Sequence, residues 1–238
     1  MDAARTIASL AAGLAAVALP WAGLAAAAAD GDTPSRCGDR PGRTLTERGA
    51  GRVLLARQEV WACVRGVARP DLIGGQWRPA VSSSGGGGVL RVAVDGRFVA
   101  SSSENFSDGF DDVAFSVRDA RRHRTTFLRF YPSGSVAGRA RQAEAFDLVL
   151  CRGGRVAFLV GFRSDSSGPI ESYEVRRSSG RHTVLLARSV DIEPGSLRAT
   201  PGRIAWRASG VKATAAAPCK APSTSVAVPK LTVDEVFG

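Results

Sequence analysis

The sequence predicts an all-β fold built from β-propeller-like repeats, and three observations support it. The first is a five-residue motif, Gly-Arg followed by three apolar or small residues. Its four copies begin at Gly51, Gly96, Gly154 and Gly202, which are 45, 58 and 48 residues apart. Periods near 45 residues are typical of four-stranded propeller blades. The other two observations are turn dipeptides at the motif and alternating apolar positions after it.

Strand-like runs precede the last three copies of the motif, and each run meets its copy at a turn dipeptide. The runs and dipeptides are 90–94 with Asp95-Gly96, 146–150 with Gly153-Gly154, and 196–200 with Pro201-Gly202. Glycine supplies the positive φ angle that tight hairpins need. The pattern predicts strand, tight turn and strand in each unit.

Two units continue into a second predicted hairpin, formed by residues 113–118 with 124–128 and by residues 171–176 with 182–186. Apolar residues alternate within the first of these runs, which indicates one buried face per strand. Four strands per unit is the blade plan. The first and last units look shorter, and strands from the two ends of the domain could complete one another's blade.

The repeats resemble those of uncharacterised exported proteins of high-GC bacteria, which are themselves similar to TolB-like β-propeller repeat proteins. The resemblance covers about Arg43 to Ala217 and is strongest at the copies that begin at Gly154 and Gly202. The copy at Gly51 departs from the pattern because it lacks an aromatic residue. The resemblance implies a binding or scaffolding surface and no particular chemistry.

The domain is expected to span residues 30–217 and to form a small or incomplete ring of about four units. A β-sandwich is the alternative. We expect Phe98, Phe158 and Trp206 to be equivalent or near-equivalent core aromatics of successive units. Residues 218–238 are rich in Pro, Ser, Thr, Ala and Lys, a composition that predicts a flexible C-terminal tail.

Residues 1–29 have the pattern of a signal peptide. Arg5 precedes an apolar run, and Ala27-Ala28-Ala29 provides the small residues that a signal peptidase requires. An uncleaved membrane anchor is the alternative, which Pro20 and the many alanines disfavour. No later stretch is apolar enough to span a bilayer. The protein is therefore expected to be secreted or to reside in the cell envelope.

Four cysteines suit an exported protein with two disulfide bonds. The absence of a Cys-x-x-Cys pair argues against a zinc or thioredoxin-type redox site. Three pairings are open, and we favour Cys37–Cys63 with Cys151–Cys219. These bonds would tie the mature N-terminus to the first strand pair and a middle strand to the end of the last repeat.

The net charge is +10, and only three of the 32 basic residues are lysines. Coding bias of a high-GC genome is one explanation. The other is attraction to an anionic polymer of the envelope, or to acidic lipids. For that case we predict an anion-binding cluster of Arg118, Arg121, Arg122 and Arg124. Nucleic acid is a weak candidate partner, because basic residues occur throughout the chain and export removes it from most nucleic acid.

The sequence contains no recognisable catalytic motif, and no cofactor or metal is expected. His123 and His182 are interpreted as solvated turn residues. Asp108, Asp111 and Asp112 offer oxygen ligands for Ca²⁺, but an ordinary acidic loop is the preferred interpretation. We therefore predict a non-enzymatic interaction or structural module with an unknown protein or an envelope polyanion as its partner. The alternative is a secreted glycosidase-like hydrolase with two dispersed carboxylates converging in a cleft.

Overall fold

The computed structural model confirms the all-β prediction. It describes residues 41–79, 85–107, 110–136, 139–164, 168–220, 222–232 and 234–235. The predicted signal peptide and Cys37 lie outside the described residues. Within the described ranges, no helix has the length and apolar character needed to cross a membrane.

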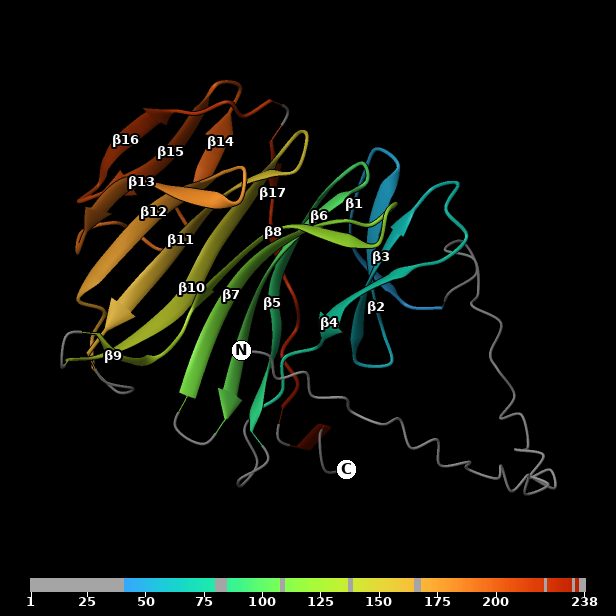
Figure 1. Cartoon of the computed structure of the whole chain (residues 1–238), viewed down its shortest axis with the longest axis horizontal. Helices are drawn as coiled ribbons and strands as arrows, with labels where there is room; N and C mark the ends of the chain where they lie inside the picture. Colours follow the sequence, from blue (N-terminus) through green and yellow to red (C-terminus); the bar gives the residue numbers. More distant parts are fainter. Residues whose placement is uncertain are drawn as a thin grey trace, which may run out of the picture. The chain divides into compact units, whose positions relative to one another are not determined.

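Four antiparallel sheets follow one another along the chain, and each contains one copy of the Gly-Arg motif (Figure 1). The first sheet consists of β1 (Arg43–Arg48), β2 (Gly51–Ala56), β3 (Glu59–Val64) and β4 (Asp71–Gly75). The second consists of β5 (Gly86–Asp95), β6 (Phe98–Ser107), β7 (Phe110–Asp119) and β8 (Arg124–Tyr131), with β18 (Val226–Ala227) beside β5. In both sheets, consecutive strands are neighbours.

The third sheet has the order β13-β12-β11-β10-β17, and β9 also pairs with β10. Its strands are β9 (Gly134–Val136), β10 (Arg139–Cys151), β11 (Arg155–Arg163), β12 (Ser172–Ser179), β13 (His182–Ser189) and β17 (Ser223–Thr224). The fourth sheet consists of β14 (Arg198–Thr200), β15 (Arg203–Ala208) and β16 (Val211–Ala216). The predicted hairpins at the last three motif copies are therefore confirmed.

Alternating side chains join each sheet to the next. Val94 and Val99 of the second sheet pack toward the first, whereas Ala93 and Ala100 pack toward the third. In the third sheet, Phe158 belongs to the core shared with the second sheet. Its neighbour Leu159 belongs to the core shared with the fourth. Adjacent residues on a strand point to opposite faces, so the two central sheets are each covered on both faces.

This packing differs from a closed propeller and from a simple two-sheet sandwich. Consecutive sheets share cores, but among the described residues no core cluster joins the first sheet to the fourth. The first sheet also obtains all four of its strands from residues 43–75. The first sheet therefore receives none of the described strands from the other end of the domain.

The predicted equivalence of the three aromatics applies to two of them. Phe158 and Trp206 are both buried, each is the fourth residue of its strand, and each packs toward the preceding sheet. Phe98 is half-buried and is instead the first residue of β6. The reason is the turn: Gly96 begins its hairpin turn, whereas Gly154 and Gly202 end theirs.

The described part of the C-terminal segment is held against the sheets, in place of the flexible tail predicted for residues 218–238. β17 extends the edge at β10, and β18 extends the edge at β5. Backbone N–H groups of Ser225 and Val228 donate to the carbonyls of Leu148 and Leu90. The side chain of Leu231 is also buried. This segment therefore bridges the second and third sheets.

Candidate anion-binding edge

The hairpin turns that carry the first two motif copies touch one another. A Cβ atom on Gly51 would overlap the carbonyl oxygen of Gly96 and lie 2.6 Å from Cγ2 of Val94. The backbone N–H of Gly96 donates to the carbonyl of Arg48 at 3.2 Å, and Arg48 pairs with Asp95 at 3.6 Å. The first motif thus needs glycine because two backbones approach closely there.

The turns of the third and fourth copies continue this series. A Cβ atom on Gly154 would lie 2.7 Å from Cδ1 of Phe98, so the third turn packs on the start of β6. The Cys151–Cys219 disulfide, as predicted, ties the third turn to the chain that leaves the fourth sheet. The N–H of Gly202 donates to the carbonyl of Cys219 at 2.7 Å. All four motif turns therefore meet at one edge of the stacked sheets.

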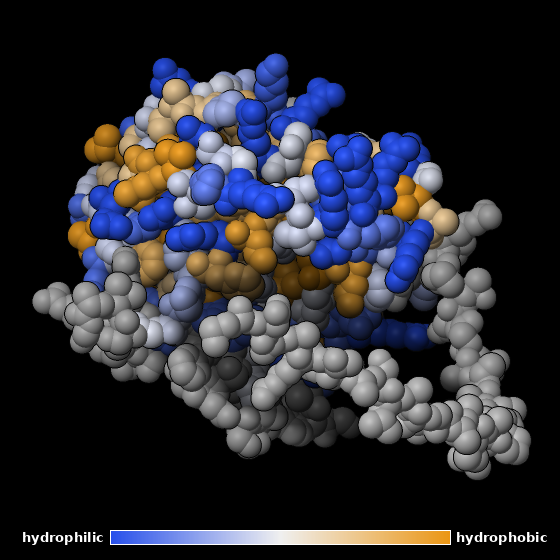
Figure 2. All heavy atoms as spheres, viewed as in Figure 1, coloured by the Kyte–Doolittle hydropathy of each residue, from blue (hydrophilic) through white to orange (hydrophobic). Residues whose placement is uncertain are grey.

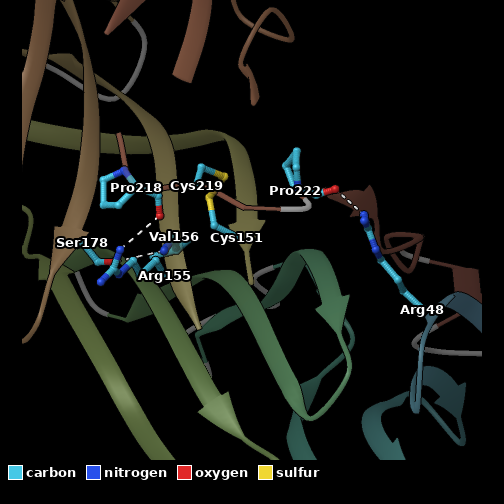
Figure 3. The surroundings of a disulfide bond; sticks show 8 residues. All are labelled: Arg48, Cys151, Arg155, Val156, Ser178, Pro218, Cys219 and Pro222. Atoms are coloured by element: carbon cyan, nitrogen blue, oxygen red, sulfur yellow. Dashed lines mark hydrogen bonds between the residues drawn. A yellow bond between two sulfur atoms is a disulfide. The ribbon is translucent and has the colours of Figure 1, made fainter. Parts of the chain in front are cut away.

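Figure 3 shows how the disulfide region is reinforced by hydrogen bonds. Arg155 donates to the carbonyl of Pro218 at 3.2 Å, and the N–H of Val156 donates to Ser178 Oγ at 2.9 Å. Arg48 of the first sheet donates to the carbonyl of Pro222. The C-terminal segment therefore contacts both ends of this series of turns.

The outer turns of the sheets lie at the same edge. The N–H of Arg65 donates to the carbonyl of Ala50 at 2.7 Å, and the N–H of Ala120 donates to the carbonyl of Arg97 at 2.9 Å. We call the resulting surface the turn edge. It comprises residues 48–51, 65–70, 95–98, 119–124, 151–155, 178–182, 200–203 and 217–220.

The turn edge is strongly basic. Its exposed Arg and Lys side chains are Arg65, Arg69, Arg121, Arg122, Arg124, Arg152, Arg155, Arg181, Arg203 and Lys220. The only acidic residues in these segments, all of which are described, are Asp95 and Asp119, and neither is exposed. Figure 2 shows hydrophilic side chains gathered over the region where Figure 1 draws β6, β8 and β1. These segments thus carry ten exposed cations and no exposed carboxylate, while the exposed Glu47 directly precedes Arg48.

Three of the four predicted anion-binding residues belong to this edge, and the fourth has a different contact. Arg121, Arg122 and Arg124 are exposed in the turn between β7 and β8. Arg118 instead forms two hydrogen bonds to the buried carboxylate of Asp71, at 2.7 and 2.9 Å. These bonds raise the pKa of Arg118 above its ordinary value. We interpret Arg118 as a residue that joins the first and second sheets.

Several of the exposed arginines have no partner within the described structure. Arg122 lies 3.9 Å from Asp119, which also pairs with Arg97 at 3.3 Å. By contrast, no described residue forms a hydrogen bond or ion pair with six of the side chains. These are Arg65, Arg69, Arg121, Arg124, Arg152 and Arg181. Their guanidinium groups can donate forked hydrogen bonds to oxyanions.

Sequence reasoning missed most of this surface because it considered one turn at a time. Arg65, Arg69, Arg152, Arg155, Arg181, Arg203 and Lys220 come from the other turns. The signal was available, since arginine follows the motif glycine in every copy. What was missing was the contact between successive turns, which depends on how the sheets stack.

A second feature lies between the second and third sheets, away from the turn edge. A cavity of about 420 Å³ is lined by Glu104 of β6, Glu144 of β10, Arg163 of β11 and Lys230 of the C-terminal segment. Glu144 and Arg163 form an ion pair. Glu104 and Glu144 therefore come from different sheets and line the same cavity. This is the arrangement expected for the two carboxylates of the glycosidase-like alternative.

The calcium hypothesis is not tested by the described side chains. Asp108 and the side chain of Asp111 lie outside the described residues. Among the residues that are described, no three His, Cys, Asp or Glu side chains gather at one point.

Comparison of the chain with protein-family models, with curated proteins and with solved structures returns no match.

Proposed function

We propose that this protein is an exported, non-enzymatic interaction module that binds an anionic polymer of the cell envelope through the turn edge. The observation that carries the proposal is the separation of charge on that edge. The edge carries ten exposed cations, and of its two acidic residues Asp119 is buried and Asp95 is half-buried. Such one-sided fields attract polyanions and accelerate their association.

The distribution of the acids supports this proposal over coding bias alone. Coding bias would raise the number of arginines but would not sort acids from bases across the fold. Exposed or half-buried acids away from the turn edge include Glu59, Glu104, Glu144, Asp191 and Glu193, and one exposed acid, Glu47, borders the edge beside Arg48. Exposed bases also occur away from the edge, as at Arg78, Arg129 and Arg207, so the edge is distinguished by its scarcity of acids.

Export is supported by the disulfide bond. Cys151 and Cys219 are bonded across 68 residues of sequence, and disulfides persist mainly in oxidising compartments. This bond is compatible with an extracytoplasmic protein. It also lies within the turn edge, so an oxidising environment keeps the third and fourth turns together.

The proposal is tested by retention of the full chain on an immobilised anionic polymer against rising salt. The edge variant R65S/R121S/R124S removes three exposed cations without breaking a hydrogen bond between described residues. The control variant R78S/R207S/K212S removes the same charge away from the edge. We expect the edge variant to elute at clearly lower salt than both wild type and control. Equal elution of the two variants would contradict the proposal.

The cavity lined by Glu104 and Glu144 favours a second candidate function, the glycosidase-like hydrolase. Paired carboxyl groups on either side of a sugar bond are the usual machinery of that reaction. Release of reducing ends from envelope polysaccharides by wild type, and its loss in E104Q, would support this candidate. Equal release of reducing ends by wild type and E104Q would rule out the hydrolase as a candidate function.

A further inference from the structure

We propose that the ligand of the turn edge is a linear polymer of phosphate groups that lies across all four sheets. This inference rests on the proposed function and names the ligand class for the same surface. It follows from the arrangement of the cations, from the absence of apolar anchors among them, and from the dominance of arginine.

The exposed cations are distributed over all four sheets. The first sheet contributes Arg65 and Arg69, the second Arg121, Arg122 and Arg124, the third Arg152, Arg155 and Arg181, and the fourth Arg203 with Lys220 from the following chain. Sheets pack face to face about 10 Å apart, so these four sets extend over about 30 Å. The turns touch in series, through Gly51 with Gly96, Gly154 with Phe98, and Cys151 with Cys219. One extended chain can therefore contact every set.

A lipid surface fits this edge less well than a polymer. Membrane-surface binding normally combines cations with apolar side chains that enter the bilayer boundary. The exposed large apolar residues of the described structure are Leu72, Leu128, Phe130, Val184, Leu185, Val190 and Val211. None of them belongs to the segments of the turn edge. The edge therefore offers charge without an apolar anchor.

The aromatic content of the edge argues against recognition of nucleobases. Proteins that bind single-stranded nucleic acids stack bases on exposed aromatic rings. The one Phe, Tyr or Trp in the turn-edge segments is Phe98, which is half-buried. Arg97 lies over its ring at 4.9 Å, and Gly154 packs against it. The ligand is therefore expected to be recognised through its phosphates alone.

Phosphate is favoured over carboxylate by the side chains themselves. Nine of the ten exposed cations are arginines, whose forked donors match pairs of phosphate oxygens. The oxygens of a phosphate are arranged tetrahedrally, so one group can accept from two arginines that approach from different directions. A carboxylate can also accept from two arginines, as Glu174 does from Arg176 and Arg188, but its oxygens lie in one plane, so fewer directions of approach are open to the donors. Each set of two or three cations thus suits a phosphate better.

The experiment compares inorganic tripolyphosphate with polyphosphate whose extended length exceeds about 30 Å, the span estimated from sheet spacing. Because one chain would engage several sets, we expect the long polymer to bind about 10²-fold more tightly per chain. Polyglutamate of equal length should bind more weakly than polyphosphate. Vesicles of acidic lipid should bind more weakly at equal accessible charge.

The number of phosphate contacts is then obtained from the dependence of the binding constant on salt concentration. Each phosphate contact is expected to contribute about 0.7 to the slope of log K against log salt, as for single strands of nucleic acid. The variant R121S/R124S should reduce the slope by about 1.4, and so should R152S/R181S. The control R78S/R207S should leave it unchanged.

Two outcomes overturn this inference while leaving the proposed function intact. One is tight binding of polyphosphate with no dependence on its length. The other is equal or tighter binding of polyglutamate or vesicles, with the edge variants still weakened. Failure of the wild type to bind any of these polyanions would instead reject the proposed function itself.

Discussion

Gly51 of the first hairpin lies against the carbonyl oxygen of Gly96 in the second, and no side chain fits between them. This contact gives the glycine of the first copy a different role from the glycines of the other three. Gly96, Gly154 and Gly202 adopt positive φ angles, between 60° and 80°. Gly51 does not, and it is required by the close approach alone. The motif therefore both turns the chain and joins one sheet to the next.

The substitution Gly51→Ala should destabilise the protein, because the new methyl group would overlap the Gly96 carbonyl. We expect a loss of about 3 kcal/mol in the free energy of unfolding, at the upper end of overpacking costs. Chemical denaturation measures it. Gly75→Ala is the matched control, since nothing lies within 4 Å of its Cβ position. A similar loss in both variants would show that the contact has no special importance.

Phe158 should be the most sensitive aromatic of the central core. Its ring is fully buried and stacks on Phe115 with the centroids 4.1 Å apart. Phe158→Ala is expected to cost about 3–5 kcal/mol. Phe130→Ala, at a residue that is 51% exposed, should cost less than about 1 kcal/mol. If thermal or chemical unfolding gave a loss below 1 kcal/mol for Phe158→Ala, the packing of the second sheet on the third would be refuted.

Removing the disulfide should weaken the protein and loosen the C-terminal segment. For a bond that closes 68 residues, the chain-entropy model gives about 4 kcal/mol for the double variant C151S/C219S. Hydrogen exchange should also accelerate at Ser225 and Val228, whose N–H groups donate to the second and third sheets. In the wild type these amides should be protected. Rapid exchange there in the wild type would restore the flexible tail that the sequence predicted.

Arg118 and Arg121 are expected to have different roles, Arg118 in stability and Arg121 in binding. Arg118→Ser leaves the buried carboxylate of Asp71 without its two hydrogen bonds. The expected loss is about 1–3 kcal/mol, toward the lower end because Arg118 is 26% exposed to water. Arg121→Ser should change stability by less than about 0.5 kcal/mol. Thermal unfolding distinguishes them, and equal losses would contradict the assignment.

The hairpins were predictable because their causes are local. Asp95-Gly96 and Pro201-Gly202 determine tight turns through the residues in the turn itself. The alternation of Val113, Phe115 and Val117 likewise identifies the face of β7 that packs toward the third sheet, and all three side chains are buried. Information of this kind extends over a few residues, so strand positions could be derived from the sequence.

The remaining features depend on contacts between distant parts of the chain. β17 and β18 contain two residues each, which is too short to show alternation. They become strands because β10 and β5 present open edges to them. The offset of Phe98 relative to Phe158 depends on the number of residues in each turn, which the motif spacing did not reveal. The turn edge required knowledge that the hairpin turns of all four sheets lie at one edge of the stack.

The most direct test of the account is to map which arginines a polyanion covers. The full chain is treated with an arginine-specific reagent with and without long-chain polyphosphate, and modified sites are quantified by peptide mass spectrometry. We predict strong protection of Arg65, Arg121 and Arg152, one from each of the first three sheets, and no protection of Arg78 or Arg207. Equal protection of all five arginines, or protection confined to Arg78 and Arg207, would contradict the turn edge as the binding surface.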